Sequence, residues 1–163
     1  MPENALSLAC SRFRELMNGK PTGNQHSVPA GRFRAIDQSV PLAKQSASIY
    51  ADKPYEVVWT EEGEPDETGP AMVSGNLIDL SATVMVRVGY LRGIGRDTSL
   101  QSDEYQDVRL IRRVLEEPRN YDSSNTGLVK VDRIKSRRLP IDEEREMVEI
   151  QFRLRLVEDQ PTQ

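Results

Sequence analysis

The sequence predicts an α+β fold, in which a mixed, mainly antiparallel β-sheet carries two packed helices and a projecting C-terminal β-hairpin. Three patterns indicate it: an amphipathic first segment, a long alternating segment at 77–91, and two alternating segments at 127–137 and 142–157. The 163 residues are enough to bury one core without metals or disulfides. We therefore expect one α+β domain over 1–158 and a disordered tail at 159–163.

Composition excludes several function classes. The net charge of −4 has the wrong sign for a protein that coats nucleic acid. The single cysteine, Cys10, and the single histidine, His26, allow no disulfide framework and no Cys/His zinc site. We interpret Cys10 as a core residue and His26 as a loop residue facing solvent. No long apolar run follows the acidic Glu3, so neither a signal peptide nor a membrane span is expected, and the predicted compartment is reducing and soluble.

The N-terminal third begins with a predicted helix over residues 3–18, whose apolar side chains recur at helical spacing. We expect the helix to end at Gly19, because glycine readily adopts the left-handed conformation that ends helices. A short strand is expected at 31–37, where Phe33 and Ala35 alternate with arginines. The segment 38–54, bracketed by prolines, is compatible with either a short strand or a loop.

A strand is predicted at 55–59, which is rich in β-forming residues. The next stretch, 60–70, holds five acidic residues, two prolines and two glycines without any basic residue, so we expect a mobile loop there. Residues 77–91 alternate between an apolar and a half-polar face and predict the central strand, with one face in the core. A helix is predicted over Ser102–Glu117, with Ser102 as its cap and basic residues in its last turns.

The last third predicts an antiparallel hairpin with a link at 138–141. Setting Val131 opposite Val148 also places three basic residues opposite three acidic ones: Arg133 with Glu146, Lys135 with Glu144, and Arg137 with Asp142. Each such pair stabilises the hairpin by about 0.2–1 kcal/mol. This register predicts a polar distal half that projects from the domain as an arm over 127–157.

Several residues are candidates for chemistry, and each has an ordinary structural interpretation. Two adjacent carboxylate pairs could serve acid–base catalysis: Asp103 with Glu104, and Glu143 with Glu144. Adjacent side chains diverge on a helix or strand, so we expect solvated carboxylates there. Asp79 and Glu149 could bind a metal, but no nearby lysine completes a nuclease-like pattern.

Two further patterns suggest binding of phosphate or nucleic acid. Gly93 and Gly95 precede a helix, but the glycine spacing of a phosphate-binding loop is missing, so we expect a flexible link. Five basic residues gather near the hairpin: Lys130, Arg133, Lys135, Arg137 and Arg138. The acidic residues of the following strand would neutralise them, which favours a polar ribbon suited to docking.

This layout resembles the tail terminator, or tail completion, proteins of tailed bacteriophages. The resemblance lies in the opening helix ending at Met17-Asn18-Gly19, the strand Leu80–Leu91, the helix Ser102–Glu117, and the hairpin Gly127–Val157 with the alternation of Val148–Leu154. The acidic stretch at 60–70 and the polar hairpin are longer than in compact members of that family. The family offers no catalytic residue to carry over.

The resemblance implies a structural virion protein, not an enzyme and without a cofactor. It would form a ring, usually a hexamer, on the end of the tail tube, stop tube polymerisation and join tail to neck after assembly in the host cytoplasm. The expected partners are other copies, the tail tube protein and a neck or head-completion protein; DNA would pass through the ring without sequence-specific binding. Eight residues are the interface candidates: Arg133, Lys135, Arg137, Asp142, Glu144, Glu146, Glu61 and Glu62. Alternatives are a head-completion or neck adaptor, and a small soluble enzyme or regulatory ligand-binding domain.

Overall fold

A five-stranded sheet in the order β1-β2-β3-β5-β4 forms the body of the protein and confirms the predicted α+β class. The computed structural model describes residues 4–19, 27–63, 77–92, 98–121 and 127–159. The β1–β2 pair is parallel and the other three pairs are antiparallel. His26, the glycines at 93 and 95, the stretch 64–70 and the tail residues 160–163 lie outside the described residues.

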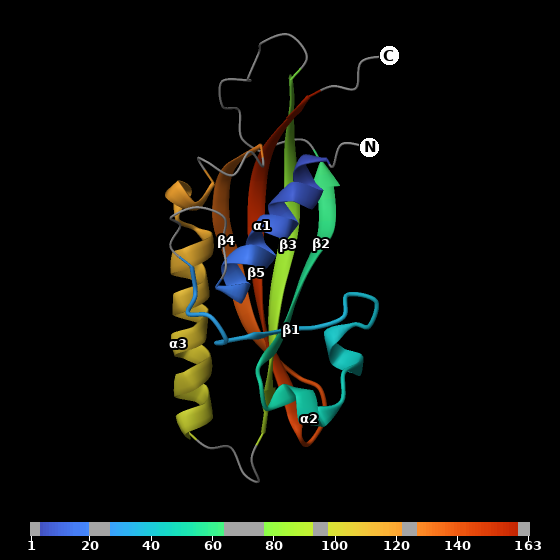
Figure 1. Cartoon of the computed structure of the whole chain (residues 1–163), viewed down its shortest axis with the longest axis vertical. Coiled ribbons are helices and arrows are strands. Elements are labelled where there is room, and N and C mark those ends of the chain that lie inside the picture. Colours follow the sequence, from blue (N-terminus) through green and yellow to red (C-terminus); the bar gives the residue numbers. More distant parts are fainter. Residues whose placement is uncertain (1–3, 20–26, 64–76, 93–97, 122–126, 160–163) are drawn as a thin grey trace.

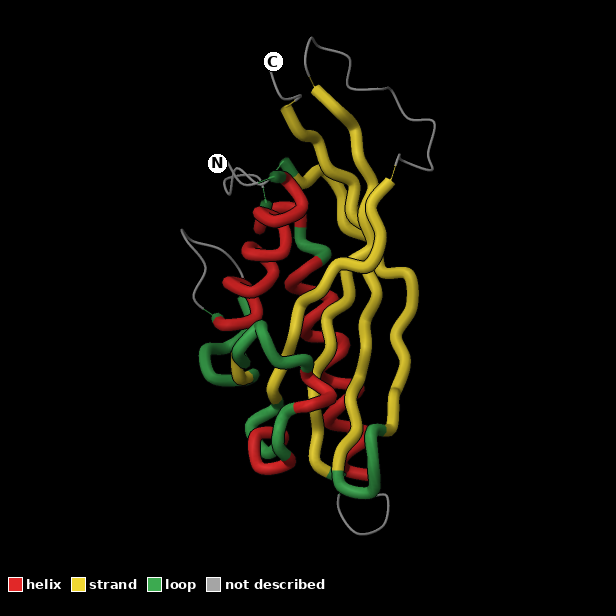
Figure 2. The backbone as a smooth tube through the Cα atoms, turned by 90° about the vertical axis from the view of Figure 1, so that its right-hand side faces the viewer, coloured by secondary structure: helices red, strands yellow, loops and turns green. Residues whose placement is uncertain are grey.

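The elements follow one another in chain order as α1 (Ala5–Asn18), β1 (Arg34–Ala35), η1 (Leu42–Lys44), α2 (Ala47–Tyr50), β2 (Pro54–Gly63), β3 (Leu77–Leu91), α3 (Thr98–Leu115), η2 (Pro118–Asn120), β4 (Leu128–Pro140) and β5 (Arg145–Asp159). Helices α1 and α3 lie on one side of the sheet, as Figures 1 and 2 show. Helix α3 runs along β4 at the border of the sheet.

Helix α1 forms where its capping residues and its apolar stripe predict it. The side chain of Asn4 accepts a hydrogen bond from the Ser7 N–H at 2.7 Å, and Gly19 ends the helix with φ 72°. The stripe includes Phe13, whose ring packs edge-on against Phe152 at 5.8 Å between centroids. Cys10 is buried in this stripe, as predicted.

The core lies between the two long helices and the sheet. The apolar residues of the two helices and the central strands that fill it are buried, among them Phe13, Val86, Val88, Ile111, Leu115, Ile150 and Phe152. The predicted parity of β3 is also confirmed, because Ala82, Val84 and Tyr90 lie in the same cluster. Burial of these side chains supplies most of the driving force for folding.

Several boundaries differ from the sequence prediction in the first two thirds of the chain. The strand expected at 31–37 is only Arg34–Ala35, because the chain turns at Gly31, where φ is 80°. The undecided segment 38–54 forms η1 and α2. Helix α3 begins at Thr98 instead of Ser102, and Leu100 in this added turn packs against the core.

The first four residues of the stretch expected to form an acidic loop, 60–63, belong to strand β2. Strand β2 continues to Gly63, since Glu61, Glu62 and Gly63 pair with Thr83, Ala82 and Ser81 of β3. A register shift lies between Trp59 and Glu61. The long neighbouring strand therefore holds residues in the sheet that composition alone assigns to a loop.

The prediction of a projecting hairpin arm is wrong. Strand β5 pairs with β3 along its whole length, from Leu91 opposite Arg145 to Leu77 opposite Asp159. It is thus an inner strand of the sheet, and Asp159 belongs to it and not to a tail. Both halves of the hairpin are part of the domain (Figure 2).

The predicted hairpin register is also wrong. Val131 pairs with Leu154 and Val148 with Arg138, so the chain reverses at 141–144 instead of 138–141. Two bulges in β4, between Leu128 and Lys130 and between Arg133 and Lys135, change which residues share a face. A single alternating register therefore cannot describe β4.

The three predicted charge pairs do not form. Arg137 contacts Glu149, Asp142 contacts Arg145, and Glu146 contacts Arg138. The turn is fixed instead by the Asp142 carboxylate, which accepts hydrogen bonds from the backbone N–H groups of Glu144 and Arg145 at 2.9 and 2.8 Å. Exposed charge pairs are too weak to set a register against the burial of β5.

Candidate functional site: two borders of the sheet

The sheet ends on two outer borders that differ in chemistry. Among the described strands, β4 pairs only with β5, so its other edge faces outward. On the opposite border, β1 covers β2 only at Pro54 and Tyr55. Along the rest of β2, no strand of the described part of the chain lies on the side away from β3. Open edges of this kind are places where another chain can dock.

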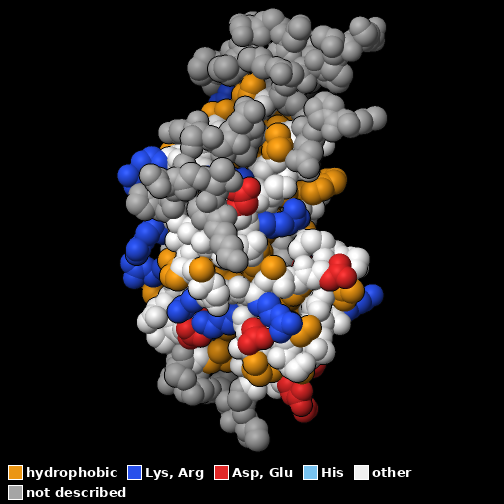
Figure 3. All heavy atoms as spheres, viewed as in Figure 1, with side chains coloured by type: hydrophobic (Ala, Val, Ile, Leu, Met, Phe, Trp, Pro, Cys, Tyr) orange, Lys and Arg blue, Asp and Glu red, His pale blue; other side chains and the backbone are white. Residues whose placement is uncertain are grey.

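The β4 border is basic and partly apolar. Arg133, Lys135 and Arg137 are exposed there, as predicted, and Val129 and Ile134 leave 58% and 41% of their surface exposed. Figure 3 shows Lys and Arg side chains gathered on the side of the molecule where α3 lies. One outward backbone group of β4 already has a partner, since the Arg133 N–H donates to Oε1 of Glu116, the residue after α3, at 3.0 Å.

Strand β2 has an acidic sequence and carries an exposed aromatic residue. Trp59 leaves 57% of its surface exposed, and Glu61 and Glu62 follow it in the strand. No lysine or arginine occurs between Lys53 and Arg87. The sequence of β2 is therefore acidic, whereas the sequence of β4 is basic.

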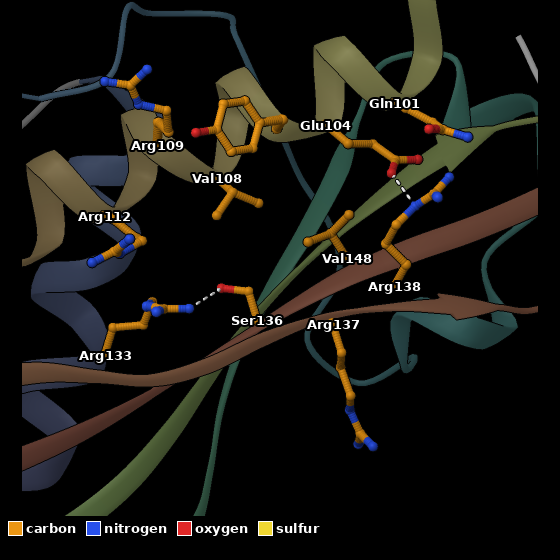
Figure 4. Close-up of a pocket in the computed structure, with 11 residues that line it drawn as sticks. Gln101, Glu104, Val108, Arg109, Arg112, Arg133, Ser136, Arg137, Arg138 and Val148 are labelled. Carbon is orange, nitrogen blue, oxygen red and sulfur yellow. Dashed lines mark hydrogen bonds and ion pairs between the residues drawn. The ribbon is translucent and has the colours of Figure 1, made fainter. Parts of the chain in front are cut away.

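A groove separates α3 from the β4 border (Figure 4). Its volume is about 560 Å³, and it is lined by Gln101, Glu104, Tyr105, Val108, Arg109, Arg112, Arg133, Ser136, Arg137, Arg138 and Val148. Figure 4 shows Val108 and Val148 between helix and strand, with Arg109 and Arg112 along the helix. Tyr105 is 63% exposed, and the guanidinium of Arg109 lies 5.8 Å from the centre of its ring. We name this feature the α3–β4 groove.

A buried charge cluster fixes one end of the groove. Arg138 Nε lies 2.6 Å from Glu104 Oε2, and its Nη2 lies 3.0 Å from Glu146 Oε2. Arg92 approaches Glu146 Oε1 at 3.4 Å. Burial, followed by the neighbouring Glu146 carboxylate, raises the pKa of Glu104 to about 7. The cluster joins α3 to β4 and β5 and positions the groove walls.

A second charge cluster surrounds Asp107, a fully buried residue of α3. Its carboxylate accepts hydrogen bonds from Arg32 Nη2 at 2.6 Å, Lys53 Nζ at 2.9 Å and the Tyr90 hydroxyl at 2.8 Å. Burial and the Asp107 charge raise the pKa of Tyr90. Donors from these three residues saturate the carboxylate, so the cluster ties α3 to the strands and to the segment before β1.

The interface candidates therefore occupy three different environments. Arg133, Lys135 and Arg137 lie exposed on β4, and Asp142 and Glu144 lie exposed in the hairpin turn. Glu146 is buried, which corrects its assignment to an exposed arm. The backbones of Glu61 and Glu62 lie in β2, on the opposite border of the sheet.

The carboxylates considered above for catalysis or metal binding do not come together in the structure. Asp103 contacts Lys53 at 2.8 Å, while its neighbour Glu104 contacts Arg138, so the two side chains diverge as expected. Asp79 of β3 pairs with Val157, whereas Glu149 pairs with Arg87, much further along β3. Asp79 and Glu149 are therefore far apart. Among the described residues, no group of three His, Cys, Asp or Glu side chains is placed to hold a metal ion.

Sequence reasoning did not identify the Asp107 and Glu104 clusters. Asp107 and Lys53 are far apart in the chain, and no local pattern links them. The signal available in the sequence was the position of Asp107 among the apolar residues of this helix, because a carboxylate in such a position is buried and needs partners.

None of the described helices has the length and hydrophobicity needed to cross a membrane. A scan against protein-family models finds no match, and a search of curated proteins finds no similar sequence.

Proposed function

We propose that this protein is a structural subunit of a tailed bacteriophage that assembles into a ring at the end of the tail tube, ends tube polymerisation and joins tail to neck. The observation that supports it best is the opposite chemistry of the two sheet borders. A ring requires a head-to-tail interface, in which two different surfaces of one subunit meet.

The charges favour such an interface over binding of one acidic or basic ligand. Arg133 and Lys135 are exposed on β4, whereas the sequence of β2 includes Glu61 and Glu62 and no basic residue. Placing the β2 border of one copy beside the β4 border of the next would join opposite charges. The exposed Trp59, Val129 and Ile134 would add apolar contact area at this joint.

The strand directions favour the same arrangement. Strands β2, β3, β5 and β4 alternate in direction, so β2 and β4 run opposite to each other. A second copy placed side by side would bring its β2 antiparallel to β4. The joint would then extend the antiparallel pattern of the sheet.

The ring would surround the path of the DNA, and its faces would contact the tail tube protein and a neck or head-completion protein. A neck adaptor would use the same self-association at a different position in the particle. The location of the protein in the particle therefore distinguishes a tail terminator from a neck adaptor.

The test combines mass measurement with imaging. We expect the purified protein, or the protein in particles, to form closed rings, and phage particles to carry it where tail meets neck. Particles that lack the protein should have tubes of variable length. The enzyme or ligand-binding alternative would instead be supported if the protein is a monomer that retains a small molecule and if particles lacking the protein assemble normally.

A further inference from the structure

Trp59 is the single tryptophan of the chain and lies on the acidic β2 border. It pairs with Val84, a core residue, so its side chain lies on the side of the sheet that carries the helices. There it borders a shallow hollow of about 350 Å³ with Leu6, Cys10 and Arg14 of α1. A large aromatic side chain left exposed on a sheet edge is typical of a residue that anchors an interface.

The α3–β4 groove has the chemistry that such an anchor needs. Val108, Val148 and the exposed Tyr105 ring offer an apolar surface, and several arginines surround it. Arginine binds both the face of an indole ring and carboxylates. In the described part of the chain, no carboxylate forms an ion pair with the guanidinium of Arg109 or Arg133.

We propose that the α3–β4 groove of one copy binds Trp59 of the next copy. The inference rests on the proposed self-association and assigns its two contact sites. Both sites lie on the helix-bearing side of the sheet, at opposite borders, as a head-to-tail joint requires. Opposite charge selects this segment, because no basic residue accompanies Trp59 on β2.

The test uses two defective variants of the full chain that should repair each other. Trp59→Ala removes the anchor and keeps the groove. The double variant Tyr105→Ala with Arg109→Glu removes the aromatic ring and reverses one charge of the groove but keeps Trp59. Each alone should be monomeric, with an affinity for itself lowered at least about tenfold. Mixed together they retain one intact joint, so we expect a heterodimer and no larger ring.

Trp59 itself reports the contact, because the chain has no other tryptophan. Adding the Trp59→Ala copy to the groove variant should shift the emission of Trp59 to shorter wavelength and reduce its quenching by acrylamide. Arg113→Glu is the matched control, since Arg113 is exposed on α3 and does not line the groove. This control should assemble like the native chain, and thermal melting should show that all variants are folded.

The outcomes separate this inference from the proposed function. If the native chain forms rings but the mixed variants stay monomeric, or Trp59 remains equally quenchable in the ring, the groove is not the acceptor and the ring proposal stands. If the native chain remains monomeric with an exposed Trp59 at every concentration, the inference is overturned, and imaging of particles decides the proposed function independently.

Discussion

Arg87 and Glu149 face each other across β3 and β5, with 2.7 Å between Arg87 Nε and Glu149 Oε2. They form the centre of a row that crosses four strands on the face opposite α1 and α3. Glu56 lies on one side, 3.0 Å from Arg87, and Arg137 on the other, 2.8 Å from Glu149. Burial opposes ionisation of Glu149, but its hydrogen bonds, led by that from Arg87, hold its pKa below the usual value. The row joins β2 to β4 through both inner strands.

Replacing Arg87 by methionine should destabilise the protein strongly. Arg87→Met leaves the fully buried Glu149 with only the half-exposed Arg137 as its cation, and removal of one partner from a buried pair costs about 3–5 kcal/mol. Arg137→Met should cost no more than about 1 kcal/mol, because Arg87 still pairs with Glu149. Urea unfolding measures both free energies, and equal losses would contradict the central role of Arg87.

Leu115 tests the packing of α3 against the sheet. Its side chain is fully buried in the main core, so Leu115→Ala should lower the free energy of unfolding by about 2–5 kcal/mol. Leu91→Ala is the control, because Leu91 is largely exposed at the end of β3 and its loss should cost much less. Calorimetric melting compares them. A small effect at Leu115 would show that α3 does not pack as described.

Glu104 should make stability depend on pH. Its pKa in the folded state is raised to about 7 from an ordinary value of 4.5, so between these values the folded protein binds more protons than the unfolded chain. The contribution of Glu104 therefore favours folding below about pH 4.5 and is lost as pH rises to about 7.

Glu104→Gln should remove this part of the pH dependence, since glutamine does not titrate. Melting temperatures measured from pH 4 to pH 8 check the expectation. Asp103→Asn is the control on the same helix and should leave the decline between the two pKa values in place. An unchanged pH profile in Glu104→Gln would show that Glu104 is not the titrating group.

Reversing charge on the β4 border should weaken assembly more than folding. The double variant Arg133→Glu with Lys135→Glu places acid on both borders, so copies should repel each other. Stability should change by only about 0–1 kcal/mol per site, since both side chains are exposed. Arg137 is left in place because it pairs with the buried Glu149.

The matched control reverses two exposed charges away from β4, Lys44→Glu with Arg113→Glu. Sedimentation of both variants beside the native chain gives their oligomeric state. A second chain with Glu61→Lys and Glu62→Lys should restore association with the β4 variant. Rings that persist in the β4 variant would exclude this border from the interface.

Local periodicity in the sequence was enough to predict α1, the inward face of β3 and the buried core. Phe13, Val86 and Ile150 each belong to a stripe or alternating run, and such a pattern states which side of an element avoids water. The exposure of Arg133 and Lys135 could be predicted on the same basis. These properties depend on near neighbours in the chain.

Pairing between elements was decided only by the tertiary structure. Strand β5 has an outer partner, β4, and an inner partner, β3, and the inner pairing buries Phe152 against α1. The bulges in β4 and the placement of Lys53 beside Asp107 likewise arise from contacts between distant segments. A register is selected by the summed free energy of such contacts, and a few exposed charge pairs are too weak to reveal it.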